Sequence, residues 1–208
     1  MPHGGPIGPR DINSFNSQVQ FLTNRGYSVL QVNYRGSRGF GRAFKNSGRG
    51  QWGRKIEQDI STAVEQVTKQ TSFKHTCAIG ASYGGYSSVM LAILHPKQYD
   101  CVVARFGVFD LPLIFNDRNT KKSDYLQKVW SKVVGEYTPK LKDYSPVYFA
   151  DLLKAPILIT AGRLDTRASF EHSNRLKYVL EKTSMKLSTF IIDTQPMATQ
   201  TPTIPSMN

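Results

Sequence analysis

The chain has 208 residues, of which 39% are hydrophobic and 20% are charged, an ordinary composition for one globular domain with a core. The net charge is +12, but the 27 lysines and arginines are spread along the chain without zinc-finger spacing or an RNA-binding aromatic motif, so we expect no nucleic-acid partner. No apolar run approaches the roughly 20 residues of a membrane helix, so we expect no membrane partner either.

The spacing of apolar residues in the first part of the chain predicts four segments. A helix is expected over residues 12–24, and a buried, β-rich strand over residues 27–34. Residues 35–53 are rich in glycine and arginine, which indicates a long loop with a short helix. Residues 55–71 carry isoleucine, alanine and valine on one face and predict an amphipathic helix.

The alternation of strands and helices continues to near the end of the chain. The further predicted strands cover residues 76–79, 101–108, 155–161 and 186–192, the further helices cover residues 83–95, 145–153 and 169–182, and residues 116–144 are predicted to be irregular. This alternation indicates an α/β fold, a mostly parallel sheet with helices on both faces. We expect residues 1–193 to form one domain and residues 194–208, rich in threonine and proline, to form an irregular tail.

The strongest chemical signal is Gly80-Ala81-Ser82-Tyr83-Gly84, directly after an apolar run. Gly-x-Ser-x-Gly between a strand and a helix is typical of a nucleophile elbow, a sharp turn that exposes the serine hydroxyl. The two glycines leave room that a Cβ atom would fill. The backbone N–H of Tyr83 then lies at a helix N-terminus, where it stabilises a developing oxyanion. The pattern predicts acyl transfer with Ser82 as the nucleophile.

A second signal lies near the start of the chain, in His3-Gly4-Gly5-Pro6. A His-Gly-Gly turn upstream of the elbow fits the loop that supplies the other oxyanion N–H in α/β-hydrolases. We expect His3 to shape this loop rather than to transfer protons. The turn is a weak signal alone and a strong one when an elbow follows it.

The two cysteines, Cys77 and Cys101, both lie in apolar strand-like runs. They predict buried thiols rather than a disulfide or a metal site. Thiols of this kind, and the lack of a basic region followed by an apolar run at the start, favour a cytoplasmic location. No cluster of His, Cys and Asp has metal-ligand spacing, so we expect neither a metal nor another cofactor.

Taken together, several segments resemble the catalytic domain of the prolyl oligopeptidase family of serine peptidases, particularly its acylaminoacyl-peptidase and dipeptidyl-peptidase-like branch. The matching segments are residues 3–6 (HGGP), 32–44 (VNYRGSRGFGRAF), 51–59 (QWG followed by QD), 80–86 (GASYGGY) and 156–169 (PILITAGRLDTRAS). The resemblance implies an α/β-hydrolase fold that is incomplete at both ends of this chain. It also implies peptide substrates, no cofactor and, in the whole protein, an N-terminal β-propeller domain.

The resemblance also assigns roles to four residues. Ser82 would be the nucleophile, the backbone N–H groups of Gly5 and Tyr83 would form the oxyanion hole, and Asp165 would be the acid of the triad. A carboxylate on the loop after a parallel strand lies at the sheet edge where the serine also emerges, which suits that role. The alternative for Asp165 is a turn or N-cap residue before the helix that starts near residue 169. The chain order Ser, Asp, His favours the catalytic role.

The histidine of the triad is not found. In the family it follows the acid by about thirty residues in a His-Gly pair, consistent with the order Ser, Asp, His, but residues 194–199 contain no histidine. His172, the only histidine after Asp165, lies inside a predicted helix and is an unfavourable substitute base. Read from one base earlier, the codons of Met197 and Ala198 give NAT-GGC, which encodes His-Gly when the preceding codon ends in C. We hypothesise a frameshift after residue 193; the alternative is a diverged tail.

Three functions follow from these observations. The leading one is a serine-type peptidase that cleaves oligopeptides through an acyl-enzyme on Ser82 and is impaired in this chain by the missing histidine. An esterase-like hydrolase would use the same elbow, because the fold does not fix the substrate. A non-catalytic binding fragment would also account for the missing base.

Overall fold

The computed structural model describes residues 1–165, 167–183 and 187–192. Four parallel strands form one sheet in the order β1-β2-β3-β4, with bounds β1 Cys77–Ala81, β2 Cys101–Arg105, β3 Ile157–Gly162 and β4 Leu187–Ile192. The predicted α/β fold is therefore confirmed, and four of the predicted strands lie where the apolar runs placed them. The tail predicted for residues 194–208 lies outside the described residues and stays a prediction.

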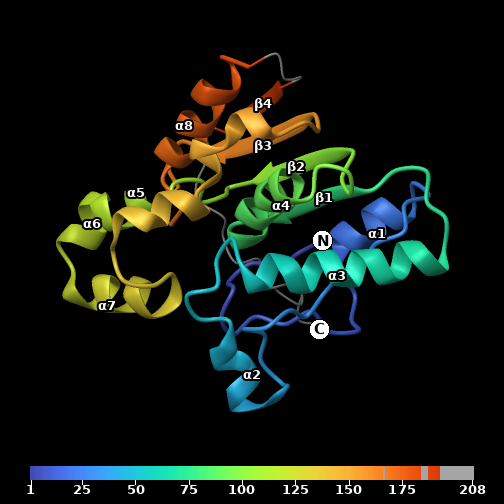
Figure 1. Ribbon diagram of the computed structural model, residues 1–208, viewed down its shortest axis with the longest axis horizontal. Helices are drawn as coiled ribbons and strands as arrows, with labels where there is room; N and C mark the ends of the chain where they lie inside the picture. The colour runs from blue at the N-terminus through green and yellow to red at the C-terminus, as the bar shows by residue number, and fades with distance from the viewer. Residues whose placement is uncertain (166, 184–186, 193–208) are drawn as a thin grey trace, which may run out of the picture.

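Two helices connect neighbouring strands of the sheet. Helix α4 (Tyr83–Leu94) leads from β1 to β2, and α8 (Phe170–Leu180) leads from β3 to β4. Because crossovers between parallel strands are right-handed and these strands follow one another in one direction, both helices cover the same face. Helix α3 (Lys55–Gln70) packs against α4 on its outer side (Figure 1).

The core fills the space between this helical layer and the sheet. Its buried side chains include Ile56 and Ile60 of α3, Val89 to Leu91 of α4, Val102 and Ala104 of β2, Ile157 and Ile159 of β3, and Leu176 and Leu180 of α8. The alternate residues of the strands point to the other face, where they are less covered. Ile79 and Val103 there are half-buried, and Leu158 is 36% exposed.

The prediction of a buried strand over residues 27–34 is wrong. No strand is assigned there, and most of its side chains are exposed or half-buried. A strand needs a neighbouring strand for its backbone hydrogen bonds, and none of the strands in the described part of the chain pairs with this segment. Its carbonyl groups include that of Leu30, which accepts a hydrogen bond of 2.6 Å from the Met1 amino group.

The two short helices of the first part of the chain are α1 (Ser17–Thr23) and α2 (Gly41–Ser47). Helix α1 begins later than predicted because the side chain of Asn16 accepts hydrogen bonds from two backbone N–H groups and caps the helix there. Helix α2 is the short helix predicted within residues 35–53, and it projects from the body of the molecule (Figure 1).

The irregular structure predicted for residues 116–144 is also wrong. After β2 the chain forms a lobe of three helices, α5 (Leu111–Asn116), α6 (Arg118–Lys121) and α7 (Asp124–Val133), at one end of the sheet (Figure 1). Trp130 and Val133 of α7 pack against the core, and Leu126 and Val129 are half-buried with them. These four residues recur at the i, i+3, i+4, i+7 spacing of an amphipathic helix, a signal that sequence reasoning overlooked. Residues 145–153, predicted as a helix, form 3-10 turns at Pro146–Tyr148 and Ala150–Leu152 instead, after a further one at Pro139–Tyr144.

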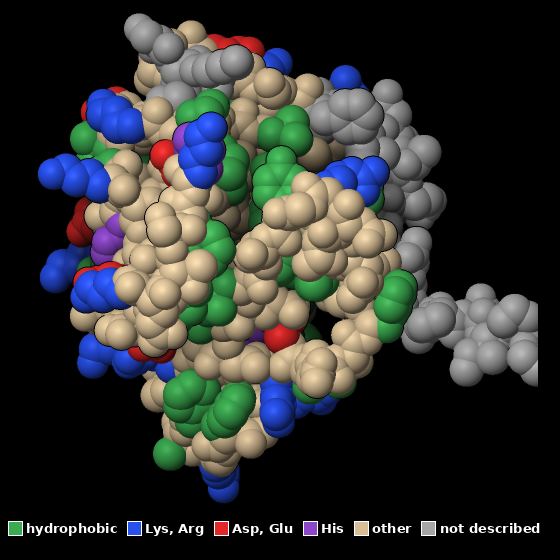
Figure 2. All heavy atoms as spheres, turned by 90° about the vertical axis from the view of Figure 1, so that its right-hand side faces the viewer, with side chains coloured by type: hydrophobic (Ala, Val, Ile, Leu, Met, Phe, Trp, Pro, Cys, Tyr) green, Lys and Arg blue, Asp and Glu red, His purple; other side chains and the backbone are tan. Residues whose placement is uncertain are grey.

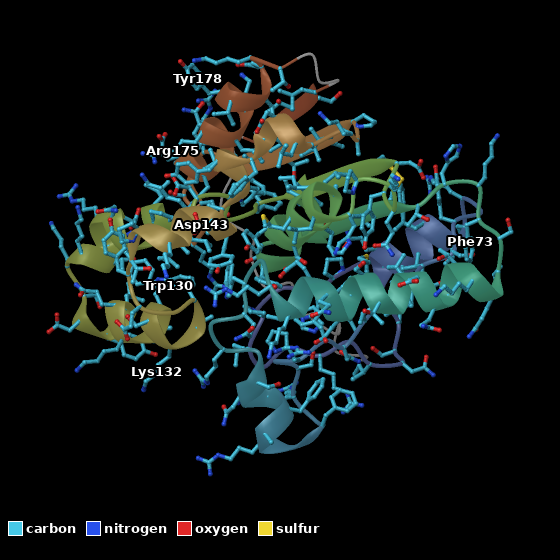
Figure 3. All side chains as sticks on the ribbon, viewed as in Figure 1. Phe73, Trp130, Lys132, Asp143, Arg175 and Tyr178 are labelled. Carbon is cyan, nitrogen blue, oxygen red and sulfur yellow. A yellow bond between two sulfur atoms is a disulfide. The ribbon has the colours of Figure 1, made fainter. Side chains whose placement is uncertain are left out.

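The prediction of two buried thiols is wrong as well. Cys77 and Cys101 are direct partners in the register of β1 and β2, with Cα atoms 4.6 Å apart, and they form a disulfide. Cys77 is exposed and Cys101 is half-buried. The bond closes the end of the two strands where each begins, on the side of Phe73 in Figure 3. Cys77 and Cys101 therefore no longer favour the cytoplasmic location, which stays a prediction.

The surface reflects the basic composition. Lysine and arginine side chains occupy several separate parts of the face in Figure 2 rather than one continuous patch. Among the described helices, none combines the length and the apolar character needed to cross a membrane.

Candidate active site

Ser82 occupies the sharp turn between β1 and α4. Its backbone has φ 55° and ψ −122°, a conformation that is rare for a residue with a side chain. The turn is held on both sides, because the Ser82 N–H donates to the Arg105 carbonyl oxygen at 2.9 Å and the Ser82 carbonyl accepts from Gly85 and Tyr86 at 3.0 and 3.1 Å. Strain of this kind persists only where the surroundings hold it in place. The geometry is that of a nucleophile elbow.

The glycines around Ser82 are required by close backbone contacts. A Cβ atom on Gly80 would overlap the backbone of Gly84, and one on Gly84 would overlap the Pro2 carbonyl oxygen. A Cβ atom on Gly85 would lie 2.7 Å from the carbonyl oxygen of Arg105. The motif therefore explains Gly80 and Gly84, whereas the need for Gly85 depends on the neighbouring strand and was not found from the sequence.

The His-Gly-Gly turn lies directly against the elbow. A Cβ atom built on Gly4 would be 3.8 Å from the Cβ atom of Ser82, and Gly5 adopts a φ of 126° that favours glycine. His3 is fixed in the turn, because its Nε2 and the Ser37 hydroxyl are hydrogen-bonded at 2.8 Å and its ring stacks on Tyr34 with centroids 4.2 Å apart. Burial lowers the pKa of His3. The structure thus brings together the two predicted parts of the oxyanion hole.

Tyr83 is the first residue of α4, and its side chain is anchored beneath the elbow. The ring is buried and packs edge-on against Trp52, with centroids 4.5 Å apart. The hydroxyl donates a hydrogen bond of 2.7 Å to the carboxyl group of Glu57, which is fully buried on α3. Sequence reasoning missed Glu57. The available signal was its position beside Ile56 and Ile60 on the buried face of the helix.

Asp165 lies on the loop after β3, at the sheet edge where Ser82 follows β1. It is largely buried, and its Oδ1 accepts hydrogen bonds from the backbone N–H groups of Arg167 at 2.8 Å and Ala168 at 3.0 Å. These contacts are those of the turn-forming alternative. They hold the carboxylate in place, and no donor to Oδ2 is present in the part of the chain that the structure describes, so the catalytic role stays a prediction.

None of the four histidines hydrogen-bonds to Ser82. His172 lies in the first turn of α8, where it is buried and its Nδ1 accepts the backbone N–H of Asp110 at 3.3 Å. Burial lowers the pKa of His172 to about 4, so the ring is neutral at pH 7. His75 precedes β1 and His95 follows α4, so both lie near the edge of the sheet where the strands begin, opposite the edge that carries Ser82. His172 is thus bound as a structural group.

A second buried carboxylate near this edge was also missed. Asp110 follows β2, its side chain is 1% exposed, and Arg175 of α8 donates to it at 2.7 Å. Arg175 lies at the same end of the molecule as the α5–α7 lobe (Figure 3). Its Nε also donates to Glu171 at 2.9 Å. Within the parts of the chain that the structure describes, no group of three or more His, Cys, Asp or Glu residues is arranged to hold a metal ion.

Comparison with known families and proteins decides the ancestry of this arrangement. A family model described as "Prolyl oligopeptidase family" matches residues 13–196. The chain belongs to the prolyl oligopeptidase family. It is 37% identical over 189 residues to dipeptidyl peptidase family member 6 of Caenorhabditis elegans, covering 88% of this chain and 25% of that protein. It is 31% identical over 186 residues to the acylamino-acid-releasing enzyme of Homo sapiens, covering 82% of this chain and 24% of that protein.

Solved structures of peptidases share the fold of this chain. The acylaminoacyl peptidase of Pyrococcus horikoshii, uncomplexed, matches with a TM-score of 0.84 and 23% identity, over 94% of this chain and 32% of that chain. A puromycin-hydrolyzing peptidase of Mycobacterium tuberculosis matches with a TM-score of 0.81 and 26% identity, over 92% of this chain and 29% of that chain. The fold is that of the α/β-hydrolases, and the chain spans about a quarter of the length of its curated relatives.

Proposed function

We propose that this chain is the catalytic part of a serine-type peptidase with Ser82 as its nucleophile. The observation that carries the proposal is the strained turn at Ser82 with the His-Gly-Gly turn packed against it. The Ser82 Oγ attacks a peptide carbonyl carbon, the C–N bond breaks, and the acyl group stays on the serine until water releases it. The backbone N–H groups of Tyr83 and Gly5 stabilise the oxyanion of each tetrahedral intermediate.

The proton transfers are the incomplete part of this mechanism. A histidine would take the Ser82 proton and return it to the leaving amine, and Asp165 would fix its tautomer. No histidine follows Asp165 except His172, whose Nδ1 is engaged with Asp110. When a triad residue is missing, the oxyanion hole and substrate binding alone still accelerate hydrolysis about 10³–10⁴-fold over the reaction in water. We therefore propose that this chain turns over peptides only slowly.

The names of two relatives support a proposal for the substrate class. Two relatives are named for dipeptidyl peptidase and acylamino-acid-releasing activities, and we propose that the natural substrates are likewise oligopeptides. Because the matched structures are about three times as long as the aligned part, we propose that the whole protein contains a further domain, a β-propeller, that restricts access to Ser82. A large substrate would then be excluded by size.

Chemical rescue tests the proposal on the chain as it exists. Free imidazole replaces the missing base in solution, so it should accelerate acylation of Ser82 by an aminoacyl p-nitroanilide and by a p-nitrophenyl ester, measured by intact mass and by released chromophore. The Ser82→Ala variant should form no acyl-enzyme with either. Faster release from the anilide, relative to its uncatalysed hydrolysis, supports a peptidase, and release from the ester alone supports an esterase.

A non-catalytic role is the second candidate, and it is favoured because the hydrogen bonds of the described histidines go to groups other than Ser82. A binding fragment would hold peptides without cleaving them. The same experiment separates the two functions, because a binding fragment shows no acyl-enzyme with or without imidazole. Peptide binding measured by calorimetry, unchanged in Ser82→Ala, would then support the binding role.

A further inference from the structure

A carboxyl group lies buried beneath the candidate oxyanion hole. Glu57 is fully buried, and its Oε1 accepts the Tyr83 hydroxyl at 2.7 Å. The Ser87 hydroxyl and the backbone of Gly53 lie near the same carboxyl group and offset part of the rise in its pKa that burial causes, although none of the described residues forms a hydrogen bond with Oε2. No described lysine, arginine or histidine forms an ion pair with it. Buried carboxylates are normally paired with a cation, so an unpaired one is costly unless it is neutral.

Glu57 is connected to both turns that form the hole. Tyr83, which Glu57 holds, supplies the N–H on the elbow side. The ring of Tyr34 lies 5.8 Å from the ring of Tyr83, and the Tyr34 hydroxyl donates to the His3 carbonyl oxygen at 2.7 Å. His3 opens the turn that carries Gly5. A continuous set of buried groups thus runs from the glutamate to each of the two N–H donors.

The charge of Glu57 matters because an oxyanion would form above it. Burial raises the pKa of Glu57 to about 7, so the carboxyl group is neutral in mildly acidic solution. The other titratable groups around it are the hydroxyls of Tyr34, Tyr83, Tyr86 and Tyr99, and burial raises the pKa of each of these, so they stay neutral as well. Ionised Glu57 would be a lone negative charge close to a site that must bind negative charge.

We propose that Glu57 is a positioning residue of the oxyanion hole, fixing Tyr83 directly and the His-Gly-Gly turn through Tyr34, and that it acts in its neutral form. The inference rests on the proposed function. The glutamate touches no substrate and acts only through the residues that it holds. Ionisation of Glu57 weakens the hole, so anion binding there falls as the pH rises.

A boronic acid tests this without a catalytic base. An α-aminoalkyl boronic acid, in which the boronic acid replaces the carboxyl group of an amino acid, adds to Ser82: the Oγ–B bond forms, the serine proton goes to solvent, and boron becomes a tetrahedral anion whose oxygen occupies the hole. Affinity is measured by calorimetry between pH 5.5 and 8.5, and the tetrahedral boron by ¹¹B NMR. Glu57→Ala should weaken binding about tenfold at pH 6, the scale of one lost hydrogen bond to a charged or buried group. Glu57→Gln, which still accepts the Tyr83 hydroxyl, should stay within about threefold at pH 6 on the same scale.

The pH profile distinguishes positioning from simple packing. Relative to Glu57→Gln, the wild-type chain should lose affinity through a midpoint near pH 7. Glu65→Gln is the matched control, since Glu65 lies on the same helix but is exposed and paired with Lys69. This control should follow the wild type throughout. Equal affinity and equal pH profiles in wild type, Glu57→Ala and Glu57→Gln would overturn the proposal.

A second measurement needs no chemistry at Ser82. The amide ¹H–¹⁵N shifts of Tyr83 and Gly5 should titrate together in the wild type and not in Glu57→Gln. A shift at Tyr83 without one at Gly5 would refute the link through Tyr34. If the boronic acid forms no Ser82-dependent adduct with the wild type, the proposed function fails, and the amide titration still decides the positioning role. If Glu57→Ala does not fold, Glu57→Gln and the amide titration decide it.

Discussion

The carbonyl oxygen of Arg105 accepts a hydrogen bond of 2.9 Å from the backbone N–H of Ser82, so β2 holds the turn that carries the candidate nucleophile. Gly85 makes this contact possible, because a Cβ atom there would lie 2.7 Å from the same oxygen and 3.1 Å from the Arg105 nitrogen. Helix α4 and β2 would have to move apart to admit a side chain.

We therefore predict that Gly85→Ala destabilises the protein by about 1–3 kcal/mol, the usual cost of overpacking. The prediction runs against helix propensity, which favours alanine over glycine by roughly 0.5–1 kcal/mol within a helix. Urea unfolding measures the difference. Gly4→Ala serves as a stability control, since its Cβ atom would have ordinary contacts of 3.5 and 3.8 Å. A Gly85→Ala variant as stable as the wild type would show that α4 is free to shift.

The disulfide between Cys77 and Cys101 should contribute substantially to stability. The bond joins residues 24 positions apart, and closing a loop of this length in the unfolded chain is worth about 3 kcal/mol. Adding dithiothreitol should lower the urea midpoint of the wild type and leave that of a Cys77→Ser/Cys101→Ser variant unchanged. Two thiols that alkylate in the unreduced, unfolded protein would show that the bond does not form.

Glu57 should make the protein less stable as the pH rises. Its folded-state pKa of about 7 lies above the ordinary value of 4.5, so between these values the folded chain holds a proton that the unfolded chain has lost. Its favourable contribution is complete below pH 4.5 and is lost as the pH rises through 7, a change of about 3 kcal/mol. Relative to Glu57→Gln, the wild type should therefore lose about this much stability across the range in urea unfolding. An equal pH dependence of stability in the two proteins would place the titration elsewhere.

His172 should have the opposite effect. Its folded-state pKa of about 4 lies below the ordinary 6.5, so the unfolded chain takes up a proton first as the pH falls. The contribution of neutral His172 to the free energy of unfolding is complete above pH 6.5. It is lost as the pH falls to 4, again a change of about 3 kcal/mol. Because the two slopes oppose each other, the wild type should have a flatter profile than either His172→Asn or Glu57→Gln. Titration near pH 6.5 of the His172 ring ¹³C shift, assigned by its loss in His172→Asn, would contradict this.

The pair of Asp110 and Arg175 offers a test with an internal control. Arg175→Met leaves the carboxylate of Asp110, 1% exposed, without its cation, and we expect a loss of about 1–3 kcal/mol, the desolvation cost of such a group. Arg175 is itself 44% exposed, which keeps the loss below that of a fully buried pair. Glu171→Ala removes the exposed partner of the same arginine and should cost less than about 0.5 kcal/mol. Equal losses in the two variants would refute the distinction.

The parts of the site that sequence reasoning located are those encoded by consecutive residues. The strand, the turn at Ser82 and α4 follow one another without interruption, so the apolar run and the spacing of Gly80 and Gly84 contain the whole signal. The His-Gly-Gly turn is also local, and its role required only that an elbow follow it. Asp165 was placed at the right edge of the sheet by the general rule that loops after parallel strands meet there.

The parts that were missed depend on neighbours that the sequence does not name. Whether Cys77 faces Cys101 is decided by strand order and register, and Gly85 is constrained by β2 rather than by its own helix. Glu57 was overlooked because a charged residue is normally exposed. The segment over residues 27–34 has the composition of a strand, but composition does not supply a partner for its backbone.

One strand, β1, carries Cys77 at its start and leads directly to Ser82 at its end. Five residues of extended chain span roughly 16 Å, and a strand within a sheet keeps that span constant. Once the disulfide is reduced and Cys101 replaced, the exposed thiol of Cys77 could carry a spin label while a second probe is attached to the serine. The distance between these two probes should stay constant during substrate binding, so a third probe on a surrounding loop can be located against both by distance spectroscopy.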